Sequence, residues 1–390
     1  MLVCRLPKKI EVVLNKRICF VTASPATVDA FLKLHVLSLA NDNDVTVVTD
    51  LSAGKLKVPA HINQKNIYIP RKISLFSDFA ALLKLYFFLY RSRFDVVISV
   101  TPKAGLLSMM AAFLCRVPLR VHWFTGQVWV TQSGWMRSLL KWCDKITARA
   151  ATNILTDSQS QMEFIIKEGV TSEDKLQIIH QGSISGVDLD KFSPDAQQRC
   201  VAREEIGVES EYTLFLFLGR LTQDKGVLDL AVAFQQLAKV ENDVFLAFIG
   251  PDEDGLQQEI LSICNDCSDK IYFKGFTDKP QYYFSAADVF VLPSYREGFG
   301  TSVIEAAAMS VPCIGSNIYG LSDAIIDKET GILFPCQDTV ELQHAMSRLA
   351  RNPDVRKAMG REARLRVQTE FSSQLVTEKF ISYIHSKMGQ

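Results

Sequence analysis

DVFVLPSYREGFGTSVIEAAAM, residues 288–309, is the stretch of sequence that decides the fold. Its apolar beginning predicts a buried strand, and its alanine-rich end predicts a helix. Gly298-Phe299-Gly300 breaks the chain between them, and Thr301 or Ser302 suits the N-cap of the helix. A strand, a tight glycine turn and a helix N-terminus together make an anion site, because free backbone N–H groups and the helix dipole point at the ligand.

Two glutamates frame this turn. Glu297 precedes it, and Glu305 lies about one helical turn inside the expected helix. Carboxylates bind phosphate poorly, but they accept hydrogen bonds from sugar hydroxyls. The turn therefore fits a nucleotide sugar, with the phosphates on the N–H groups and the ribose and hexose hydroxyls on the glutamates. The alternative is an ordinary buried turn whose glutamates are solvated or cap the helix.

The rest of the chain alternates short apolar strands with helical stretches, which predicts parallel sheets with crossover helices. The pattern stops in a turn-rich, aperiodic segment at residues 183–195 and then restarts. We therefore expect an α/β protein with two Rossmann-like domains that face a cleft. The N-terminal domain spans residues 1–185 and the C-terminal domain residues 186–371, and a last helix at about residues 372–390 packs back on the first domain.

The expected strands are residues 18–22, 45–49, 96–100, 120–124, 153–156, 177–180, 213–218, 244–249, 270–274, 289–292 and 312–315. The turn after the first strand lacks a G-x-G-x-x-G pattern, which argues against a bound dinucleotide in the first half.

A second turn opens the second half of the pattern. Residues 218–226 read LGRLTQDKG, and they place Arg220 and Lys225 just past the carboxyl end of a strand. Ligands bind at this edge of open α/β sheets. Arginine offers phosphate a fork of donors, and lysine offers a compact charge. The alternative is a pair of solvated loop cations.

Composition limits the class of protein. The 390 residues are 48% apolar, which is ample for two packed domains. No stretch reaches 18 uninterrupted apolar residues and no cleavable signal pattern is present, so we expect no transmembrane helix. Nine scattered cysteines, with one isolated C-x-x-C at Cys264 and Cys267, are typical of reduced thiols in a cytoplasmic protein.

These motifs together resemble the retaining glycosyltransferases of family 4, which have the GT-B fold. The resemblance covers nearly the whole chain beyond about residue 16. Its segments are Gly219-Arg220-Leu221, Asp224-Lys225-Gly226, Glu297-Gly298-Phe299-Gly300, Glu305-Ala306, Pro312, Gly331 and an interdomain segment at residues 182–194.

The N-terminal half resembles the bacterial subgroup that builds capsule and O-antigen repeat units on a lipid carrier. The segments that carry this likeness are Thr101-Pro102-Lys103-Ala104-Gly105 and His122-Trp123-Phe124-Thr125-Gly126. The chain departs from many relatives at one place, since Ser24-Pro25 stands where they have a Gly-Gly pair after the first strand.

The resemblance implies a donor site. Arg220 and Lys225 neutralise the diphosphate as it leaves, and main-chain N–H groups hold phosphate and hexose oxygens. The donor-binding residues implied are Gly219, Gly298, Phe299, Gly300, Thr301 and Glu305. Glu305 accepts the two ribose hydroxyls. Negative charge grows on the leaving diphosphate, so fixed cations and a helix N-terminus there are the strongest available catalytic device.

The catalytic set that the resemblance implies is completed by Glu297 and His122. Glu297 contacts hexose hydroxyls near C3 and C4, and His122 touches the C6 side of the sugar or a main-chain partner. The family's commonly proposed route is front-side attack, with the leaving phosphate taking the acceptor's proton. A pair of carboxylates acting as in retaining hydrolases is the alternative route. We interpret Glu297 as a positioning residue and not as a nucleophile.

The implied reaction moves a hexose or N-acetylhexosamine from a UDP-linked donor to a saccharide on a polyprenyl diphosphate, in surface polysaccharide biosynthesis. Lys103 and Ser24 are the expected acceptor-side residues. We expect no cofactor, no metal and no nucleic-acid partner. Three D-x-D strings begin at Asp42, Asp188 and Asp252, but each sits in a polar turn and none has a convincing set of further ligands.

Charge and aromatic patterns predict an anionic membrane surface as a further partner, at the inner face of the cytoplasmic membrane. Residues 1–200 carry 25 Lys and Arg against 16 Asp and Glu, whereas residues 201–390 carry 18 against 27. At residues 134–150 an apolar stripe, Trp135, Leu139, Trp142, Cys143 and Ile146, runs beside a basic row, Arg137, Lys141, Lys145 and Arg149. Residues 76–90 are a second aromatic candidate. The alternative is that both helices are buried against a sheet.

Other functions share the fold. A glycosyltransferase with a soluble acceptor, a non-hydrolysing nucleotide-sugar 2-epimerase and a non-catalytic binding subunit all stay open. The epimerases do not use the arrangement of Arg220, Lys225, Glu297 and Glu305 seen here, and the four intact residues argue against a decayed site.

Overall fold

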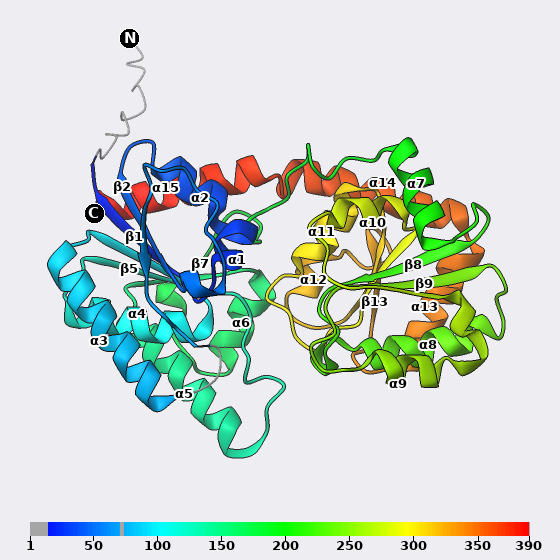
Figure 1. The fold of residues 1–390 in the computed structure, drawn as a ribbon, viewed down its shortest axis with the longest axis horizontal. Coiled ribbons are helices and arrows are strands. Elements are labelled where there is room, and N and C mark those ends of the chain that lie inside the picture. The colour runs from blue at the N-terminus through cyan, green and yellow to red at the C-terminus, as the bar shows by residue number, and fades with distance from the viewer. Residues whose placement is uncertain (1–14, 71–73, 390) are drawn as a thin grey trace, which may run out of the picture. The chain divides into compact units, whose positions relative to one another are not determined.

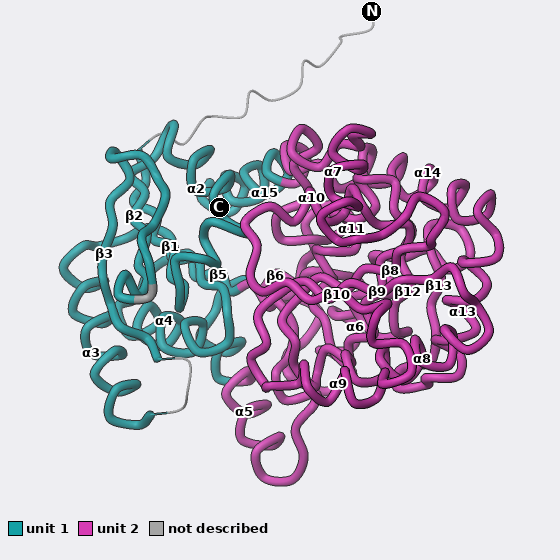
Figure 2. The backbone as a smooth tube through the Cα atoms, turned by 45° about the vertical axis from the view of Figure 1, so that its right-hand side comes forward, with its two compact units in different colours: residues 1–122, 146–153, 377–390 teal, residues 123–145, 154–376 magenta. Residues whose placement is uncertain are grey.

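The computed structural model describes residues 15–70 and 74–389. These residues group into two compact units (Figure 2). Unit 1 contains residues 1–122, 146–153 and 377–390, and unit 2 contains residues 123–145 and 154–376. The predicted domain boundary at residue 185 stays a prediction.

The first sheet has seven strands in the order β3-β2-β1-β4-β5-β6-β7. Its strands are β1 Arg17–Val21, β2 Asp44–Thr49, β3 Asn63–Asn66, β4 Val96–Val100, β5 Leu119–Phe124, β6 Asn153–Thr156 and β7 Leu176–Ile178. β1 pairs in parallel with β2 on one side and with β4 on the other. The order of the strands therefore reverses between β1 and β4, and a reversal of this kind is where α/β sheets bind ligands.

The second sheet has six strands in the order β10-β9-β8-β11-β12-β13. Its strands are β8 Thr213–Leu218, β9 Val244–Ile249, β10 Ile271–Lys274, β11 Val289–Leu292, β12 Cys313–Ser316 and β13 Gly331–Phe334. β8 pairs in parallel with β9 and with β11. Here the order reverses between β8 and β11, so the turns that follow these two strands meet at the ligand edge.

Helices cover the sheet strands of each unit. In unit 1, α3 and α4 lie on one side of the strands, and α2 and α15 lie on the other (Figure 1). The helical segments of the first half are α1 Pro25–Thr27, η1 Val28–Leu32, α2 Lys33–Leu39, η2 Leu51–Ala53, α3 Leu75–Ser92, α4 Pro102–Leu114, α5 Gly134–Ala150, α6 Gln159–Lys167 and η3 Glu173–Lys175.

In unit 2, α8, α9 and α13 lie on one face of the second sheet, and α7, α10, α11 and α14 lie on the other (Figure 1). The helical segments of the second half of the chain are α7 Ala196–Ile206, η4 Gln223–Lys225, α8 Val227–Ala238, α9 Gln257–Ile263, η5 Asn265–Lys270, α10 Pro280–Ala286, α11 Thr301–Ala308, α12 Leu321–Ala324, α13 Thr339–Arg351, α14 Pro353–Glu370 and α15 Ser373–Met388. Because both faces are covered, the central strands are apolar along their whole length.

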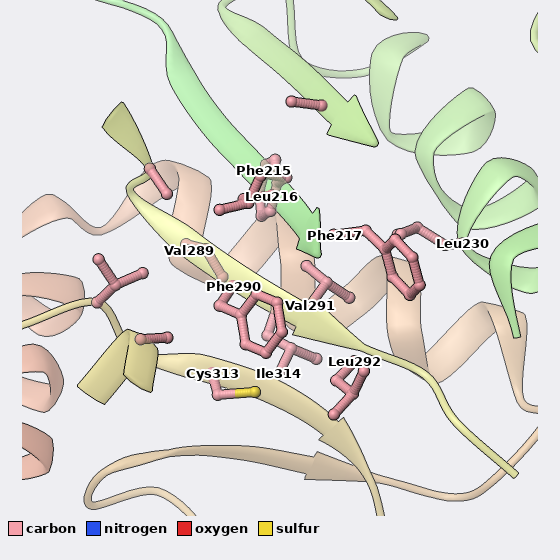
Figure 3. Packing of buried hydrophobic residues seen from close by; sticks show 14 of the residues in the cluster. Phe215, Leu216, Phe217, Leu230, Val289, Phe290, Val291, Leu292, Cys313 and Ile314 are labelled. Atoms are coloured by element: carbon pink, nitrogen blue, oxygen red, sulfur yellow. The ribbon is translucent and has the colours of Figure 1, made fainter. Parts of the chain in front are cut away.

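The centre of the second sheet shows this packing (Figure 3). Phe215 and Phe217 on β8, Phe290 on β11 and Ile314 on β12 are fully buried. Side chains from three neighbouring strands thus form one continuous core. This core fixes the positions at which β8 and β11 end, and therefore the positions of the two turns that follow them.

The final helix carries a specific contact in unit 1. Thr377 on α15 hydrogen-bonds through its Oγ1 to Nδ1 of His35 on α2, at 3.1 Å. The rings of Phe380 and His35 lie 4.5 Å apart, and all three side chains are buried. Residues 377–390 accordingly group with the first 122 residues of the chain.

The expectation of two parallel sheets is confirmed, and most strands lie where the sequence predicts them. Two strands were not predicted. β3 reads NQKN and is exposed along its length, so it lacks an apolar signal. β13 reads GILF and directly follows the turn at Thr330, and its first residue is a glycine, which weakens the strand signal.

The predicted N-cap of the helix after β11 is wrong. Gly300, and neither Thr301 nor Ser302, occupies the N-cap of α11, and no side chain caps the helix there. Gly300 has φ +82°, a left-handed conformation that glycine adopts without strain, and it directs the chain straight into the helix. The helix therefore begins at Thr301, one or two residues earlier than expected. Among the described residues, no helix is long and apolar enough to cross a membrane.

Candidate functional site

The turns after β8 and β11 lie side by side at the ligand edge of the second sheet. Gly226 in the first turn approaches so closely that a Cβ on it would lie 2.1 Å from the carbonyl oxygen of Pro293 in the second. The amide of Tyr295 donates to the carbonyl of Asp224 at 2.9 Å, and Arg296 pairs with the Asp224 carboxylate at 2.8 Å. Backbone and side-chain bonds thus hold the two predicted ligand turns together.

Lys225 and Glu297 meet across these turns. The Lys225 ammonium group forms an ion pair with Oε1 of Glu297, and both side chains are largely buried. Ser294 donates a hydrogen bond of 2.9 Å to the same oxygen. The sequence placed these two residues 72 positions apart on separate motifs, and the fold brings them into contact. A fixed, partly desolvated cation at this edge suits a ligand with developing negative charge.

Arg220 lies in a more open position. Its Nη1 is 2.8 Å from Oε2 of Glu253, and its side chain is 44% exposed. Glu253 follows β9, the other neighbour of β8, so three adjacent strand ends contribute to this edge. The Arg220–Glu253 pair is exposed enough that the guanidinium group can exchange its partner for a phosphate at little cost.

The glycine turn after β11 packs against other parts of unit 2. Gly300 touches Leu321, whose Cδ2 would lie 2.5 Å from an added Cβ. Phe299 is buried, with its ring 5.2 Å from the ring of Phe371. The Phe299 side chain is therefore a packing anchor, and only its backbone can serve a ligand. Thr301 is the first residue of α11. The first N–H groups of a helix have no hydrogen-bond acceptor in a preceding helical turn.

Glu305 lies in the second turn of α11, on the helix that opens beside this glycine turn. Burial raises the pKa of its carboxyl group to about 7, and Lys191 opposes part of that shift. Without a ligand the group is therefore divided between its neutral and charged forms near neutral pH. A ligand that donates hydroxyl hydrogen bonds would favour the charged form.

The ligand edge of the first sheet lies after β1 and β4. Ser24 caps α1, and its hydroxyl oxygen accepts a hydrogen bond from the amide of Ala26 at 3.2 Å. Lys103, in the first turn of α4, pairs with Asp78 at 2.8 Å, and about a fifth of each side chain is exposed. The structure thus gives both predicted residues a local partner.

His122 ends the part of β5 that belongs to unit 1. Its side chain is fully buried, and its Nδ1 lies 2.8 Å from the hydroxyl of Ser99 on β4. Gly105 of α4 packs directly on the ring, because a Cβ there would lie 2.2 Å from Cε1. Burial lowers the pKa of His122 to about 3, so the imidazole is neutral in any physiological buffer. Contact of His122 with a sugar stays a prediction.

Comparison with known proteins identifies the family. The family model "Glycosyl transferases group 1" matches residues 199–366, and "Glycosyl transferase 4-like domain" matches residues 28–182. The capsular polysaccharide biosynthesis glycosyltransferase CapM of Staphylococcus aureus is 30% identical over 325 residues, which cover 81% of this chain and 83% of CapM. The chain is a group 1 glycosyltransferase.

Two further comparisons agree with this family. The UDP-Gal:alpha-D-GlcNAc-diphosphoundecaprenol alpha-1,3-galactosyltransferase of Escherichia coli is 28% identical, over 77% of this chain and 78% of its own length. The structure of HepE of Anabaena in complex with UDP and glucose shares the fold, with a TM-score of 0.80, 16% identity and coverage of 95% of this chain and 100% of HepE. This glycosyltransferase therefore has the GT-B fold of family 4.

Of the residues that enclose Gly298 of this glycosyltransferase, Thr125 belongs to the His122–Gly126 motif, but Asp157 and Ser158 belong to no sequence motif. A Cβ on Gly298 would lie 2.7 Å from Oδ2 of Asp157 and 2.7 Å from the carbonyl carbon of Thr125. Ser158 donates a hydrogen bond of 3.2 Å to the Gly298 carbonyl. Asp157 and Ser158 directly follow β6, and this place after a strand end was the signal that could have indicated them.

In two of the three D-x-D strings, the first aspartate binds backbone amides of its own turn, whereas Asp44 of the string that begins at Asp42 pairs with Arg17 and Asn63. Asp188 accepts hydrogen bonds from the amides of Asp190 and Lys191, and Asp252 accepts them from Leu256 and Gln257. Among residues 15–70 and 74–389, no three His, Cys, Asp or Glu side chains are grouped so that they could hold a metal ion.

Proposed function

We propose that this glycosyltransferase moves a hexose or N-acetylhexosamine, with retention, from a UDP-sugar to a saccharide carried on a polyprenyl diphosphate. The observation that carries the donor half is the contact of Lys225 with Glu297 beside the glycine turn that opens α11. At one strand reversal, the cation and the helix N-terminus match the diphosphate of a nucleotide sugar, and the carboxylate matches its hydroxyls.

In the proposed mechanism, Lys225 and Arg220 face the leaving diphosphate. Negative charge grows on that group as the glycosidic bond breaks, so cations fixed before the reaction stabilise the transition state more than the ground state. Glu297 holds the Lys225 ammonium group in place and offers its second carboxylate oxygen to hexose hydroxyls. The acceptor hydroxyl approaches from the face that the diphosphate leaves, and the diphosphate takes its proton.

Two relatives support the choice of donor and acceptor. HepE was solved with UDP and glucose, and the E. coli relative is named for a UDP-Gal donor and a diphosphoundecaprenol acceptor. CapM is named for capsular polysaccharide biosynthesis. We infer the same classes of ligand for this chain and a role in building surface polysaccharides, such as capsule or O-antigen. Lys103 would bind the acceptor diphosphate by releasing Asp78.

The test is a transfer assay with the purified protein. UDP-glucose, UDP-galactose and their N-acetylated forms are each incubated with and without a prenyl-diphosphate-linked sugar, and the products are separated by mass. Product that requires the lipid-linked acceptor supports the proposal. A new sugar nucleotide without any acceptor would instead identify a 2-epimerase, transfer to a free sugar alone would identify a soluble acceptor, and binding without product would identify a non-catalytic subunit.

An anionic membrane surface completes the proposal, and α3 offers the stronger contact. Exposed apolar residues recur at helical spacing along one face of α3, and among them Phe76 is 94% exposed. The exposed apolar residues of this face are Leu75, Phe76, Phe79, Leu83, Phe87 and Tyr90. Lys84 and Arg91 are exposed on the same helix, whereas its one acid, Asp78, is paired with Lys103. Aromatic residues with cations and without free acids are typical of helices that lie in a membrane interface.

The helix α5 has a smaller capacity for such contact than its sequence suggests. Trp135 is 72% exposed, in agreement with the proposed membrane stripe. However, Arg137 and Lys141 both pair with Glu168, at 3.1 and 2.7 Å, and both lie over the ring of Trp129. Half of the predicted basic row is therefore engaged within unit 2.

Vesicle co-sedimentation tests this surface. We expect binding to phosphatidylcholine vesicles that contain phosphatidylglycerol, weaker binding to pure phosphatidylcholine, and loss with salt, because each basic residue near the surface contributes about 1 kcal/mol. Replacing Phe76, Phe79 and Phe87 by Ser should release the protein. The matched control is Phe276→Ser, since Phe276 is 78% exposed but lies in unit 2. Equal binding of both variants, or no binding of the wild type at low salt, would contradict the proposal.

A further inference from the structure

We propose that Asp157 is a positioning residue for the donor site, and that its carboxyl group works in the neutral form to hold the Gly298 turn without adding charge beside the donor phosphates. The inference rests on the proposed donor role of that turn. Asp157 would not touch the donor. It acts through Gly298, which it meets directly.

The backbone of Asp157 is held rigidly where β6 ends. Its amide donates to Oε1 of Gln161 at 2.7 Å, and its carbonyl accepts from the amide of Ser183 at 2.7 Å. The side chain is 3% exposed. Both the amide and the carbonyl group of Asp157 are therefore hydrogen-bonded within the fold.

The side chain of Asp157 lies directly against the glycine turn. Its Oδ2 would be 2.7 Å from a Cβ on Gly298, and the neighbouring Ser158 hydroxyl bonds the Gly298 carbonyl at 3.2 Å. Gly298 does not have a positive φ, so close approach, and not conformation, explains why this position is glycine. The segment at Asp157 and Ser158 therefore packs against the Gly298 turn and supports it.

The surroundings of this carboxyl group favour its neutral form. Trp123 adjoins this carboxyl group, and Oδ1 of Asp157 is buried without a hydrogen-bond partner among the described residues. Burial raises the pKa of Asp157 to about 8, and the neighbouring Trp123 indole opposes part of that shift. Nothing among these contacts compensates a negative charge, so ionisation would be costly at neutral pH.

The neutral form also suits the proposed ligand. Among the neighbours named here, Trp123, Thr125, Gln161 and Ser183 carry no charge, and the titratable neighbour is Glu297, which adjoins Gly298 and is paired with Lys225. A carboxylate at position 157 would place an uncompensated negative charge behind the turn that receives the phosphates. A protonated carboxyl group gives the same shape and a hydrogen-bond donor without that repulsion.

Binding of UDP, measured by calorimetry on the full chain, tests this inference. Asp157→Ala should raise the Kd for UDP about tenfold at pH 7, because the Gly298 turn loses its packing contact with the Asp157 side chain. The Kd of Asp157→Asn should stay within about twofold of the wild-type value. Asp144→Ala is the matched control. Asp144 is also buried and accepts a bond from a tryptophan, Trp129, at 2.7 Å, but that partner is not the donor turn.

A pH series separates the proposed role from general packing. Wild-type affinity for UDP should fall between pH 7.5 and 9.5 as the carboxyl group ionises, and the fall should be smaller in Asp157→Asn. This comparison holds even if the alanine variant does not fold. Equal pH profiles of wild type and Asp157→Asn, or equal Kd values for Asp157→Ala and Asp144→Ala, would overturn the inference. Failure of the wild type to bind UDP at all would instead refute the proposed donor site.

Discussion

The ligand edges of the two sheets are built differently. At the edge of the second sheet, Lys225 and Glu297 are paired across two turns and Arg220 lies beside them in an exposed pair. At the edge of the first sheet, Ser24 caps a short helix and the ion pair of Lys103 with Asp78 stands alone among the predicted residues. The edge of the second sheet is therefore rich in fixed charge, whereas the edge of the first sheet has little charge among the predicted residues.

This difference teaches why donor and acceptor recognition are unequally visible in a sequence. A diphosphate needs cations, which few residue types provide, and backbone N–H groups, which glycine-rich turns before a helix offer. Both features can be recognised in a sequence. The saccharide of the proposed acceptor needs shape and neutral hydrogen bonds, which many residues provide, and only its diphosphate needs a cation, for which Lys103 is the proposed residue. The donor edge can therefore be proposed residue by residue, while the acceptor edge is defined by its position after β1 and β4.

The largest expected effect on activity comes from removing either cation at the proposed donor edge. Lys225→Ala or Arg220→Ala should lower kcat/KM about 100-fold with the fold intact, since one oxyanion-stabilising donor is worth that much. Lys225→Ala should have the greater effect, because Lys225 is the more buried of the two cations. Steady-state kinetics with circular dichroism as the fold check would measure this.

The control for these variants is Lys239→Ala, a cation just past the end of α8 and away from the ligand edge, which should keep full activity. If either donor-edge variant is folded and retains more than about a tenth of wild-type kcat/KM, the comparison between the two edges loses its basis.

A smaller effect is expected from Glu305. Its pKa is raised to about 7 by burial, so its charged form is lost as the pH falls below that value. If the carboxylate accepts the ribose hydroxyls, the affinity for UDP-glucose should rise about tenfold from pH 6 to pH 8. Calorimetry across this range would show the rise, and Glu305→Gln should bind weakly with little dependence on pH. A pH-independent wild type would remove Glu305 from the ribose site.

Much of the fold could be predicted because its strands are short apolar runs between helices. β8, β9 and β11 were predicted with their observed bounds, since buried parallel strands are apolar along their whole length. The polar edge strand β3 could not be found in this way, because pairing with β2, and not its composition, makes it a strand.

The site could be predicted only to the level of its motifs. Lys225 and Glu297 were recognised on separate turns, but their contact depends on the pairing of β8 with β11. Asp157 carries no motif, and its place behind Gly298 depends on a packing distance of the folded chain. Gly300 was assigned to the turn, but its role as N-cap follows from a backbone angle that no pattern displays.

The acceptor edge should respond more weakly than the donor edge. Lys103→Ala should raise KM for the lipid-linked acceptor about fivefold and leave the Kd for UDP-glucose unchanged, because the lysine must leave Asp78 to bind a phosphate and gains little net energy. Asp78→Asn provides the opposite variant, since it frees Lys103 and should lower the same KM. Changes of equal size in acceptor KM and donor Kd, or in neither, would exclude Lys103 from acceptor binding.

The smallest expected effect is that of a chelator, which should leave activity unchanged. The donor edge already supplies Lys225, Arg220 and the N-terminus of α11 for the charge that a divalent cation would otherwise neutralise. The carboxylates of Asp188 and Asp252 are occupied with backbone amides, so recruiting them as ligands would cost those hydrogen bonds. Transfer assays in EDTA, with and without added Mg²⁺ or Mn²⁺, make the measurement. Complete loss in EDTA that either metal restores would mean that the charge at this edge is insufficient by itself, and the contrast between the two edges would then need a metal ion to explain it.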